Sequence, residues 1–265
     1  MRLKTLYEDS DFLVIDKPSG IFVHPGEKTK EKTILDLLLP KYLGIQLSHR
    51  LDKETSGVLV LAKNEKAHQF LKKQFSAPAL EIAKRGLADR QPRVKKTYIA
   101  IVDGWVKNDR GIINKPIGRS PKDFRRRLAG RGVKGKIREA ITEYKVLKRF
   151  QAPFVQNFSR LTLPRVRGGT YTDKNFEQTA PFTFLEIRPK TGRTHQIRVH
   201  MKFLNHSVAC DSLYNPKGAC PAGFDRLALH AKSIEFSALG GSASGGKNKT
   251  IKVESPLPKE FSKYL

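Results

Sequence analysis

The chain has 265 residues, enough for one large domain or two small ones, and 38% of them are hydrophobic, which is enough for a folded core. Lys and Arg number 51 against 25 Asp and Glu, a formal net charge of +26. Because a thermophile's surface is rich in both signs, this excess instead favours a polyanionic partner, above all nucleic acid. An anionic membrane surface is the remaining alternative.

The two cysteines, Cys210 and Cys220, are too few to staple a chain of this length, so the fold must depend on its core. No second cysteine pair or Cys-His cluster accompanies them, and a zinc site is not indicated. The N-terminus has no apolar signal region, and no stretch reaches the length of a membrane span. We therefore expect a soluble, cytoplasmic protein in a reducing compartment.

The first half of the chain alternates short apolar runs with amphipathic segments. Residues 12–16 predict a strand that ends in a Pro and Gly turn. Thr33 begins a predicted helix, and residues 57–62 are typical of a buried strand. The amphipathic pattern at residues 65–75 predicts a second helix, and residues 97–102 predict another strand.

The second half is predicted to contain more strands and one helix. Thr194 is expected to cap that helix, whose apolar residues recur at helical spacing. Residues 77–92 and 151–180 look like insertions, and the Gly/Ser-rich residues 239–246 predict a hairpin tip. Since strands and helices mix without regular βαβ alternation, we expect an α+β fold with a mainly antiparallel sheet. The further predicted strands cover residues 139–147, 182–187, 227–236 and 250–254.

Asp52 is the first candidate for chemistry. It stands in a polar loop between Arg50 and Lys53, directly before a buried strand, and residues 55–57 are expected to turn tightly and fix the loop. Flanking cations favour an ionised carboxylate, which at the rim of a sheet can act as nucleophile or base. The alternative is an Asp that only pins its loop by bonding local N–H groups.

A second candidate segment, residues 188–200, joins a strand to a helix through a Thr-Gly turn. A helix N-terminus favours phosphate or carboxylate, and Arg193 and Arg198 add planar donors suited to either anion. Generic phosphate contacts and a catalytic role remain equally open for these arginines. His195 and His200 do not predict a metal site, because five residues on a helix separate them by about 140°.

Two further features bear on nucleic acid. Tyr98 lies on a predicted strand, where a tyrosine is usually core, although its ring could also stack on a base. Residues 115–149 hold 13 Lys and Arg against three acidic residues, among them the run Arg125, Arg126 and Arg127, and are suited to hold RNA. No phosphate-binding loop or dinucleotide fingerprint appears, so a nucleotide cofactor is not indicated.

Together these segments resemble the RluA-type pseudouridine synthases. His49–Lys63 is similar to their catalytic signature, His-Arg-Leu-Asp-Lys-Glu-Thr-Ser-Gly followed by an apolar strand. Residues 95–104, 188–201 and 227–231 resemble further family motifs in the same order, as do the opening Val-Ile-Asp-Lys-Pro-Ser-Gly and the closing Ser-Pro-Leu-Pro. The likeness runs from about residue 8 to residue 262, interrupted by the apparent insertions.

The resemblance implies a pseudouridine-synthase fold with a basic active-site cleft, formed as a single catalytic domain over residues 1–265. It implies that Asp52 is the catalytic aspartate, that Arg198 is the basic residue paired with it, and that Tyr98 lies against the target base. Arg50 would displace that base from its stack. We further expect His49, Arg193 and the Arg125–Arg127 run to bind substrate. The family needs neither a metal nor an organic cofactor.

Two departures from the family pattern stand out. The family's usual Gly-Asp before an aromatic residue reads here Cys210-Asp211-Ser-Leu-Tyr214, so this loop is expected to differ. The small RNA-binding S4 domain that often precedes the catalytic domain has no room here, which leaves RNA binding to the catalytic domain.

We therefore expect a monomeric isomerase acting on uridines of structured RNA, either ribosomal or transfer RNA, with ribosomal RNA favoured. The alternative is a catalytically silent RNA-binding or ribosome-assembly factor that keeps the fold. A DNA-binding protein is disfavoured, because no helix-turn-helix or basic zipper pattern appears.

Overall fold

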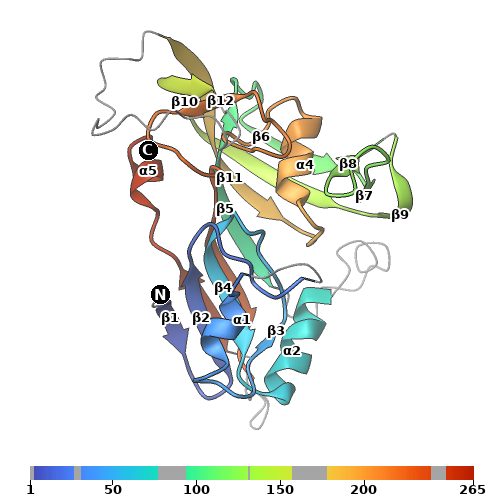
Figure 1. Cartoon of the computed structure of the whole chain (residues 1–265), viewed down its shortest axis with the longest axis vertical. Helices are drawn as coiled ribbons and strands as arrows, with labels where there is room; N and C mark the ends of the chain where they lie inside the picture. The colour runs from blue at the N-terminus through green and yellow to red at the C-terminus, as the bar shows by residue number, and fades with distance from the viewer. Residues whose placement is uncertain (1–2, 27–30, 77–93, 131, 157–177, 240–248) are drawn as a thin grey trace. The chain divides into compact units, whose positions relative to one another are not determined.

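The structure, a computed structural model, describes residues 3–26, 31–76, 94–130, 132–156, 178–239 and 249–265 (Figure 1). The predicted insertion at residues 77–92 lies outside the described residues. So do most of the segment 151–180 and most of the predicted hairpin tip at 239–246.

The chain forms two compact units, each assembled from separate stretches of sequence. The first unit comprises Met1–Tyr98, Lys190–Gly192 and His230–Leu257, and the second comprises Ile99–Pro189, Arg193–Leu229 and Pro258–Leu265. Two strands therefore pass from one unit to the other, β5 (Lys95–Asp103) and β13 (Leu229–Ser237).

The first unit is built on a mainly antiparallel sheet. Its central order is β1-β2-β4-β13, with β3 added beside β4 and β14 beside β13. The pairs β1–β2, β2–β4, β3–β4 and β13–β14 are antiparallel, whereas β4 and β13 run parallel where Ser56 lies opposite His230. The bounds are β1 (Lys4–Glu8), β2 (Phe12–Lys17), β3 (Gln46–Leu47), β4 (Ser56–Ala62) and β14 (Thr250–Glu254).

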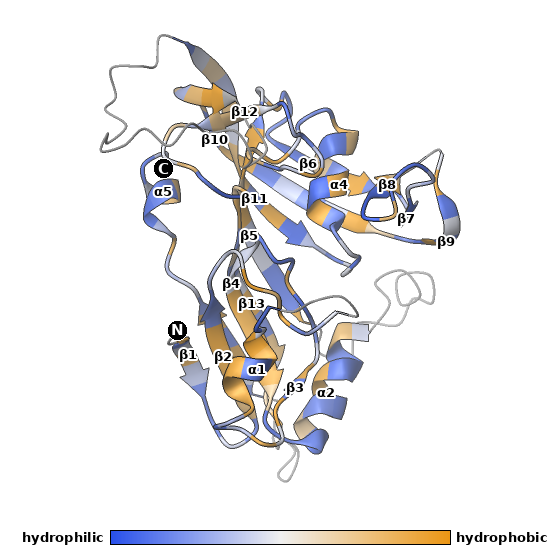
Figure 2. Cartoon of the chain, in the orientation of Figure 1, coloured by the Kyte–Doolittle hydropathy of each residue, from blue (hydrophilic) through white to orange (hydrophobic). Residues whose placement is uncertain are grey.

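Both faces of this sheet are covered, which explains why β4 is apolar throughout rather than alternating. Side chains of a strand point to opposite faces in turn. Val58 and Val60 pack with α2 (Glu65–Ser76) on one face, while Leu59 and Leu61 pack with α1 (Ile34–Leu38) on the other. Figure 2 shows β2 and β4 coloured as hydrophobic. A capping box between Thr33 and Asp36 begins α1, as the sequence predicted.

The second unit is built around one long antiparallel pair, β10 (Ile141–Gln156) with β11 (Thr179–Pro189). β6 (Arg110–Asn114) pairs with the first part of β10, and β12 (Ala219–Pro221) pairs with its end. A separate small sheet has the order β8-β7-β9. The remaining bounds are β7 (Ile117–Arg119), β8 (Arg127–Ala129), β9 (Lys134–Arg138), α4 (Gln196–Phe203) and α5 (Lys259–Ser262).

These elements confirm the α+β prediction and most predicted strands and helices. The prediction that Thr194 caps α4 is wrong. The N-cap residue is His195, in the left-handed region with φ 56°, and no side chain caps the helix. The reason is a reciprocal contact that skips Thr194. The Arg193 N–H donates to Gln196 Oε1 at 2.9 Å, and the Gln196 N–H donates to the Arg193 carbonyl at 3.0 Å.

Cys210 and Cys220 form a disulfide, with their Cα atoms 4.9 Å apart. This pairing runs against the expected reducing compartment, where disulfides are rare. The contact arises because β12 brings Cys220 back to Cys210, ten residues earlier in the chain. Across the described residues, none of the helices is long and apolar enough to cross a membrane.

Candidate active site

Asp52 opens a tight turn in the first unit. The Thr55 N–H donates to the Asp52 carbonyl at 3.1 Å, so the turn comprises residues 52–55. The prediction of a turn at residues 55–57 is therefore wrong: the turn starts three residues earlier and ends at Thr55, because Ser56 and Gly57 already belong to β4. The Asp52 side chain is half-buried at the start of this strand.

The buried side chain of Lys17 binds the backbone of the Asp52 turn. The Lys17 ammonium, fully buried at the end of β2, donates to the carbonyls of Pro18, Lys53 and Thr55 at 2.8, 3.0 and 2.8 Å. Burying a charge is costly unless hydrogen bonds compensate it, and these carbonyls do so. Two of them lie inside the turn. Lys17 was missed by the sequence analysis, although its motif was noted.

The segment after Lys17 adds two more contacts to the same turn. The Ser19 hydroxyl donates to the Glu54 carbonyl at 2.7 Å, and the Gly20 N–H donates to the Lys53 carbonyl at 2.9 Å. The Lys53 side chain pairs with Glu31 at 2.8 Å. The motif Lys-Pro-Ser-Gly therefore fixes the backbone that carries Asp52.

The turn is also fixed from the strand that follows it. Gly57 has φ +110°, and a Cβ added there would lie 2.2 Å from the Ala231 carbonyl oxygen on β13. Only glycine allows both this backbone conformation and this approach. Beside it, the Ser56 hydroxyl and His230 Nδ1 are 2.9 Å apart. The parallel strands β4 and β13 thus pair at Ser56 and Gly57, the two residues that follow the Asp52 turn.

Tyr98 and Asp52 interact electrostatically within the first unit. The pKa of the Tyr98 hydroxyl is raised, first by burial of the ring and second by the negative charge of Asp52. The ring also packs against the apolar cluster that contains Leu51 and Leu59. Tyr98 therefore packs in the core of this unit, and it keeps its proton at neutral pH.

The two residues ahead of Asp52 have different environments. His49 Nε2 accepts the Val60 N–H at 3.0 Å, and its ring stacks on Phe75 with centroids 4.6 Å apart. Burial and the nearby Lys96 lower the pKa of His49 to about 3, so the ring is neutral. Arg50 is exposed and contacts His24 Nε2 at 3.1 Å. Arg50 is thus the more accessible of the two for a substrate.

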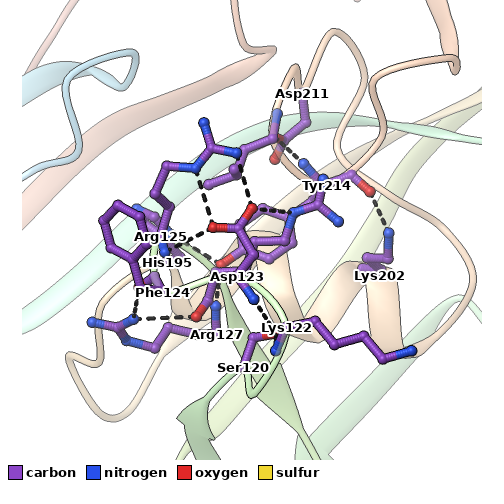
Figure 3. A network of polar contacts seen from close by, with 12 residues as sticks. Ser120, Lys122, Asp123, Phe124, Arg125, Arg127, His195, Lys202, Asp211 and Tyr214 are labelled. Atoms are coloured by element: carbon purple, nitrogen blue, oxygen red, sulfur yellow. Dashed lines mark hydrogen bonds and ion pairs between the residues drawn. The ribbon is translucent and has the colours of Figure 1, made fainter.

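In the second unit, Arg198 forms a buried ion pair with Asp211. Arg198 Nε and one terminal nitrogen each lie 2.7 Å from a carboxylate oxygen, a two-pronged geometry that fixes the guanidinium plane. Asp211 also accepts the N–H groups of Leu213 and Tyr214 at 3.0 and 2.9 Å (Figure 3). The Tyr214 ring lies under the Arg198 guanidinium, 5.0 Å away.

Asp211 was not among the residues predicted for the site. In the second unit Arg198 has Asp211 as a partner, and the pairing of Arg198 with Asp52 that the resemblance implies stays a prediction. The available signal was the Cys-Asp in place of the family's Gly-Asp, which we noted only as a departure.

Arg125 and Arg126 of the predicted arginine run lie in the turn between β7 and β8, and Arg127 is the first residue of β8. Arg125 is clamped to Asp123 through Nε at 3.1 Å and a terminal nitrogen at 3.0 Å, and Arg126 lies 3.4 Å from the same carboxylate. Arg127 donates instead to the carbonyls of Phe124 and Arg126. All three arginines therefore have fixed positions within the second unit.

The other predicted side chains of the second unit are held as well. Arg193 Nε donates to the Glu139 carbonyl at 2.9 Å, and burial together with Arg138 lowers the pKa of its guanidinium. His195 Nδ1 and the Tyr214 hydroxyl are 2.9 Å apart. Both nitrogens of the buried His200 bond within the protein, to the Thr142 hydroxyl and the Lys115 carbonyl.

The predicted residues thus fall into two groups. His49, Arg50, Asp52 and Tyr98 lie in the first unit, and the five predicted arginines at 125–127, 193 and 198 lie in the second. The first group offers a half-buried carboxylate beside a protonated phenol. The second offers fixed guanidinium groups, which suit phosphate and carbonyl oxygens.

Comparison with known proteins decides the family. The family model for RNA pseudouridylate synthase matches residues 11–203. The chain belongs to this family. Converting uridine to pseudouridine in RNA is an isomerisation, so the protein is an RNA pseudouridine synthase, and the RluA-type resemblance is confirmed.

Curated relatives agree with this assignment. The ribosomal large subunit pseudouridine synthase D of Xanthomonas campestris pv. campestris is 34% identical over 99% of this chain and 68% of its own length. The uncharacterized RNA pseudouridine synthase YlyB of Bacillus subtilis is 30% identical over 100% of this chain and 72% of its own length.

A solved structure supports the pseudouridine-synthase fold. Human RNA pseudouridylate synthase domain containing 4 matches with a TM-score of 0.64 and 23% identity, over 98% of this chain and 90% of that one. This likeness extends across both units of the chain. The predicted fold class is thereby confirmed.

Proposed function

We propose that Asp52 is the essential carboxylate of this pseudouridine synthase. The observation that carries this is the fixed backbone of the turn that bears Asp52, which Lys17 binds and which Gly57 joins closely to β13. The charge of Asp52 also acts on Tyr98, whose pKa is raised by burial first and by this charge second. A catalytic group must be held in one geometry, and this turn has backbone contacts on both sides. An Asp that merely pinned its loop would not need such support.

The reaction exchanges one bond of the uridine for another. The bond between N1 of uracil and C1′ of ribose breaks, the uracil turns over, and C5 joins C1′ while the C5 proton leaves and N1 gains a proton. Asp52 has two possible openings, attack of its carboxylate on C1′ or removal of the 2′ proton. A substrate deuterated at C2′ separates them, since only proton removal slows its turnover.

Tyr98 and Arg198 have supporting roles in this proposal. Burial and the charge of Asp52 raise the pKa of Tyr98, so its phenol is protonated in the free protein. Its ring can stack on the uracil, and its hydroxyl can donate a hydrogen bond. Arg198, held flat by Asp211, offers planar donors to the substrate, and Arg50 enters the place of the displaced base.

The substrate we propose is structured ribosomal RNA. The named relative from Xanthomonas campestris acts on the ribosomal large subunit. The net charge of +26 supports a large polyanion, and phosphate contacts by several cations make affinity fall steeply with salt. A flat salt response would count against this.

The decisive test is the variant Asp52→Asn in the purified full-length protein. We expect pseudouridine formation to cease while affinity for ribosomal RNA stays within about threefold, since one loop carboxylate adds little to phosphate binding. Retained turnover would refute the catalytic assignment. Mapping pseudouridines in ribosomal and transfer RNA of cells with and without the gene identifies the substrate.

A further inference from the structure

An exposed aromatic side chain stands in the most basic turn of the second unit. Phe124 is 83% exposed, although burying such a side chain is favourable by about 1.5–3 kcal/mol. Residues 122–127 hold four cations, one acid and this ring. Isolated exposed apolar residues are common, so exposure alone assigns no role to Phe124. The construction of the turn around it does.

The turn that carries Phe124 is fixed on both sides of it. The Ser120 hydroxyl accepts the N–H groups of Lys122 and Asp123 at 3.3 Å. Asp123 Oδ1 accepts the Arg125 N–H at 3.0 Å, and the Asp123 carbonyl accepts the Arg126 N–H at 3.0 Å (Figure 3). Arg126 then returns a bond, its carbonyl accepting the Ser120 N–H at 3.2 Å. The exposed ring is thus held out by an ordered backbone.

Hydrogen bonds connect this turn to Arg198. Arg127 donates from its side chain to the Phe124 carbonyl at 3.1 Å and from its backbone to the Tyr214 hydroxyl at 2.8 Å. The Tyr214 N–H in turn bonds Asp211, the partner of Arg198. The position of Phe124 relative to Arg198 is therefore fixed within one unit.

We propose that Phe124 stacks on an unpaired nucleobase of the RNA, while the neighbouring cations meet its phosphates. The proposal rests on the proposed function, since it takes RNA as the ligand of this unit. A phenylalanine ring has a π face but no hydrogen-bonding group, so it holds a base without reading its identity. A base bound at Phe124 would determine how far the RNA strand extends toward Arg198.

Charge and size favour RNA over other partners for this ring. One aromatic side chain is far smaller than the apolar core of a protein interface. Four cations around it instead match the regular phosphates that flank an unpaired base. A membrane surface would also attract cations and an aromatic ring, so anionic vesicles form one arm of the test.

The test compares binding to two labelled oligonucleotides with the same ribose-phosphate backbone. One is a single-stranded RNA of mixed sequence, and the other carries abasic residues throughout. The full-length variants are Phe124→Ala, Phe124→Leu and Phe124→Tyr. Ile112→Ala is the matched control, because it truncates another exposed apolar side chain of the same unit, 68% exposed on β6.

On the base-containing RNA we expect Phe124→Ala to weaken binding about 5- to 150-fold, the range for loss of one stacked base. Phe124→Tyr keeps the ring and should bind as the parent does, whereas Phe124→Leu should resemble Phe124→Ala. On the abasic oligonucleotide all these proteins and the Ile112→Ala control should bind alike. The salt dependence of binding should not change, because no phosphate contact is lost.

Three results would overturn the proposal. They are an unchanged affinity of Phe124→Ala for the base-containing RNA, an equal loss on the abasic oligonucleotide, and rescue by Leu as good as by Tyr. Dependence on Phe124 for binding anionic vesicles but not RNA would assign the ring to a membrane instead. Because these measurements concern binding alone, they are independent of the Asp52→Asn assay, and either proposal can fail without the other.

Discussion

Arg198 and Asp211 form a buried two-pronged ion pair, with the Arg198 side chain only 7% exposed and the Asp211 side chain fully buried. Thirteen residues separate them along the chain. The pair gives the guanidinium one orientation in the first turn of α4, and it has consequences for stability and for turnover.

Removing one member of this pair should be costly. Asp211→Asn removes a counter-charge from the buried Arg198 guanidinium, and we expect a loss of about 3–5 kcal/mol in the free energy of unfolding. We expect Arg198→Lys to lose turnover relative to the parent protein, because a lysine cannot make the two-pronged contact with Asp211. Denaturant unfolding and single-turnover pseudouridine assays measure the two effects. If Arg198→Lys turned over as the parent does, the planar geometry would be irrelevant.

Two glycines with positive φ offer a matched comparison. Gly57→Ala places a Cβ 2.2 Å from the Ala231 carbonyl, whereas Gly20 has φ +86° and open space around the added Cβ. Gly20→Ala should therefore cost about 1–2 kcal/mol from backbone strain alone. We expect Gly57→Ala to cost clearly more and to abolish turnover. Thermal unfolding measures both stability losses. If Gly57→Ala lost no more stability than Gly20→Ala, the close approach of β4 and β13 would not be the reason for glycine at position 57.

Lys17 should matter for turnover as well as for stability. Lys17→Met removes the donor that binds two carbonyls of the Asp52 turn, so unfolding free energy should fall by about 2–4 kcal/mol. Turnover should fall further than RNA affinity does. Lys63→Met is the control, since Lys63 bonds a carbonyl of the same unit, that of Asp9, outside this turn. Normal turnover of Lys17→Met would show that the Asp52 turn keeps its conformation without the hydrogen bonds from Lys17.

His49 should make stability depend on pH below neutrality. Its pKa is lowered to about 3 in the folded protein against about 6.5 when unfolded. Between these values the unfolded chain binds more protons, so stability is full above about pH 6.5 and falls with pH toward 3. Each pH unit can contribute about 1.4 kcal/mol at most. His49→Gln should flatten this slope in acid denaturation curves, and an unchanged slope would assign it to other groups.

The disulfide between Cys210 and Cys220 closes a loop that contains Asp211 and Tyr214. Its sequence separation of 10 residues corresponds to about 2–3 kcal/mol of stability in the chain-entropy view. Mild reduction by a dithiol should lower stability by this amount and slow turnover, because Asp211 follows Cys210 directly. Cys210→Ala with Cys220→Ala should reproduce the reduced form and lose all response to the dithiol. A response retained by that double variant would locate the effect elsewhere.

Local patterns in the sequence were enough to predict most elements. The buried strand β4 and the helix α2 follow from apolar periodicity, and the Thr33 cap follows from a local hydrogen-bonding pattern. The Asp52 segment was found in the same way, since its signature is contiguous. Such features depend on residues a few positions apart, so they can be predicted from the sequence alone.

Tertiary structure decided what depends on distant residues. Lys17 reaches carbonyls 36 and 38 residues away, and Gly57 is required only because β13 returns beside it. Asp211 became the partner of Arg198, and Cys220 the partner of Cys210, through packing that no local pattern encodes. The sequence by itself determined the family and the fold class, and it singled out Asp52 as the carboxylate to test. The contacts that hold this carboxylate and the arginine in place come from the folded chain, because they join segments that periodicity cannot connect.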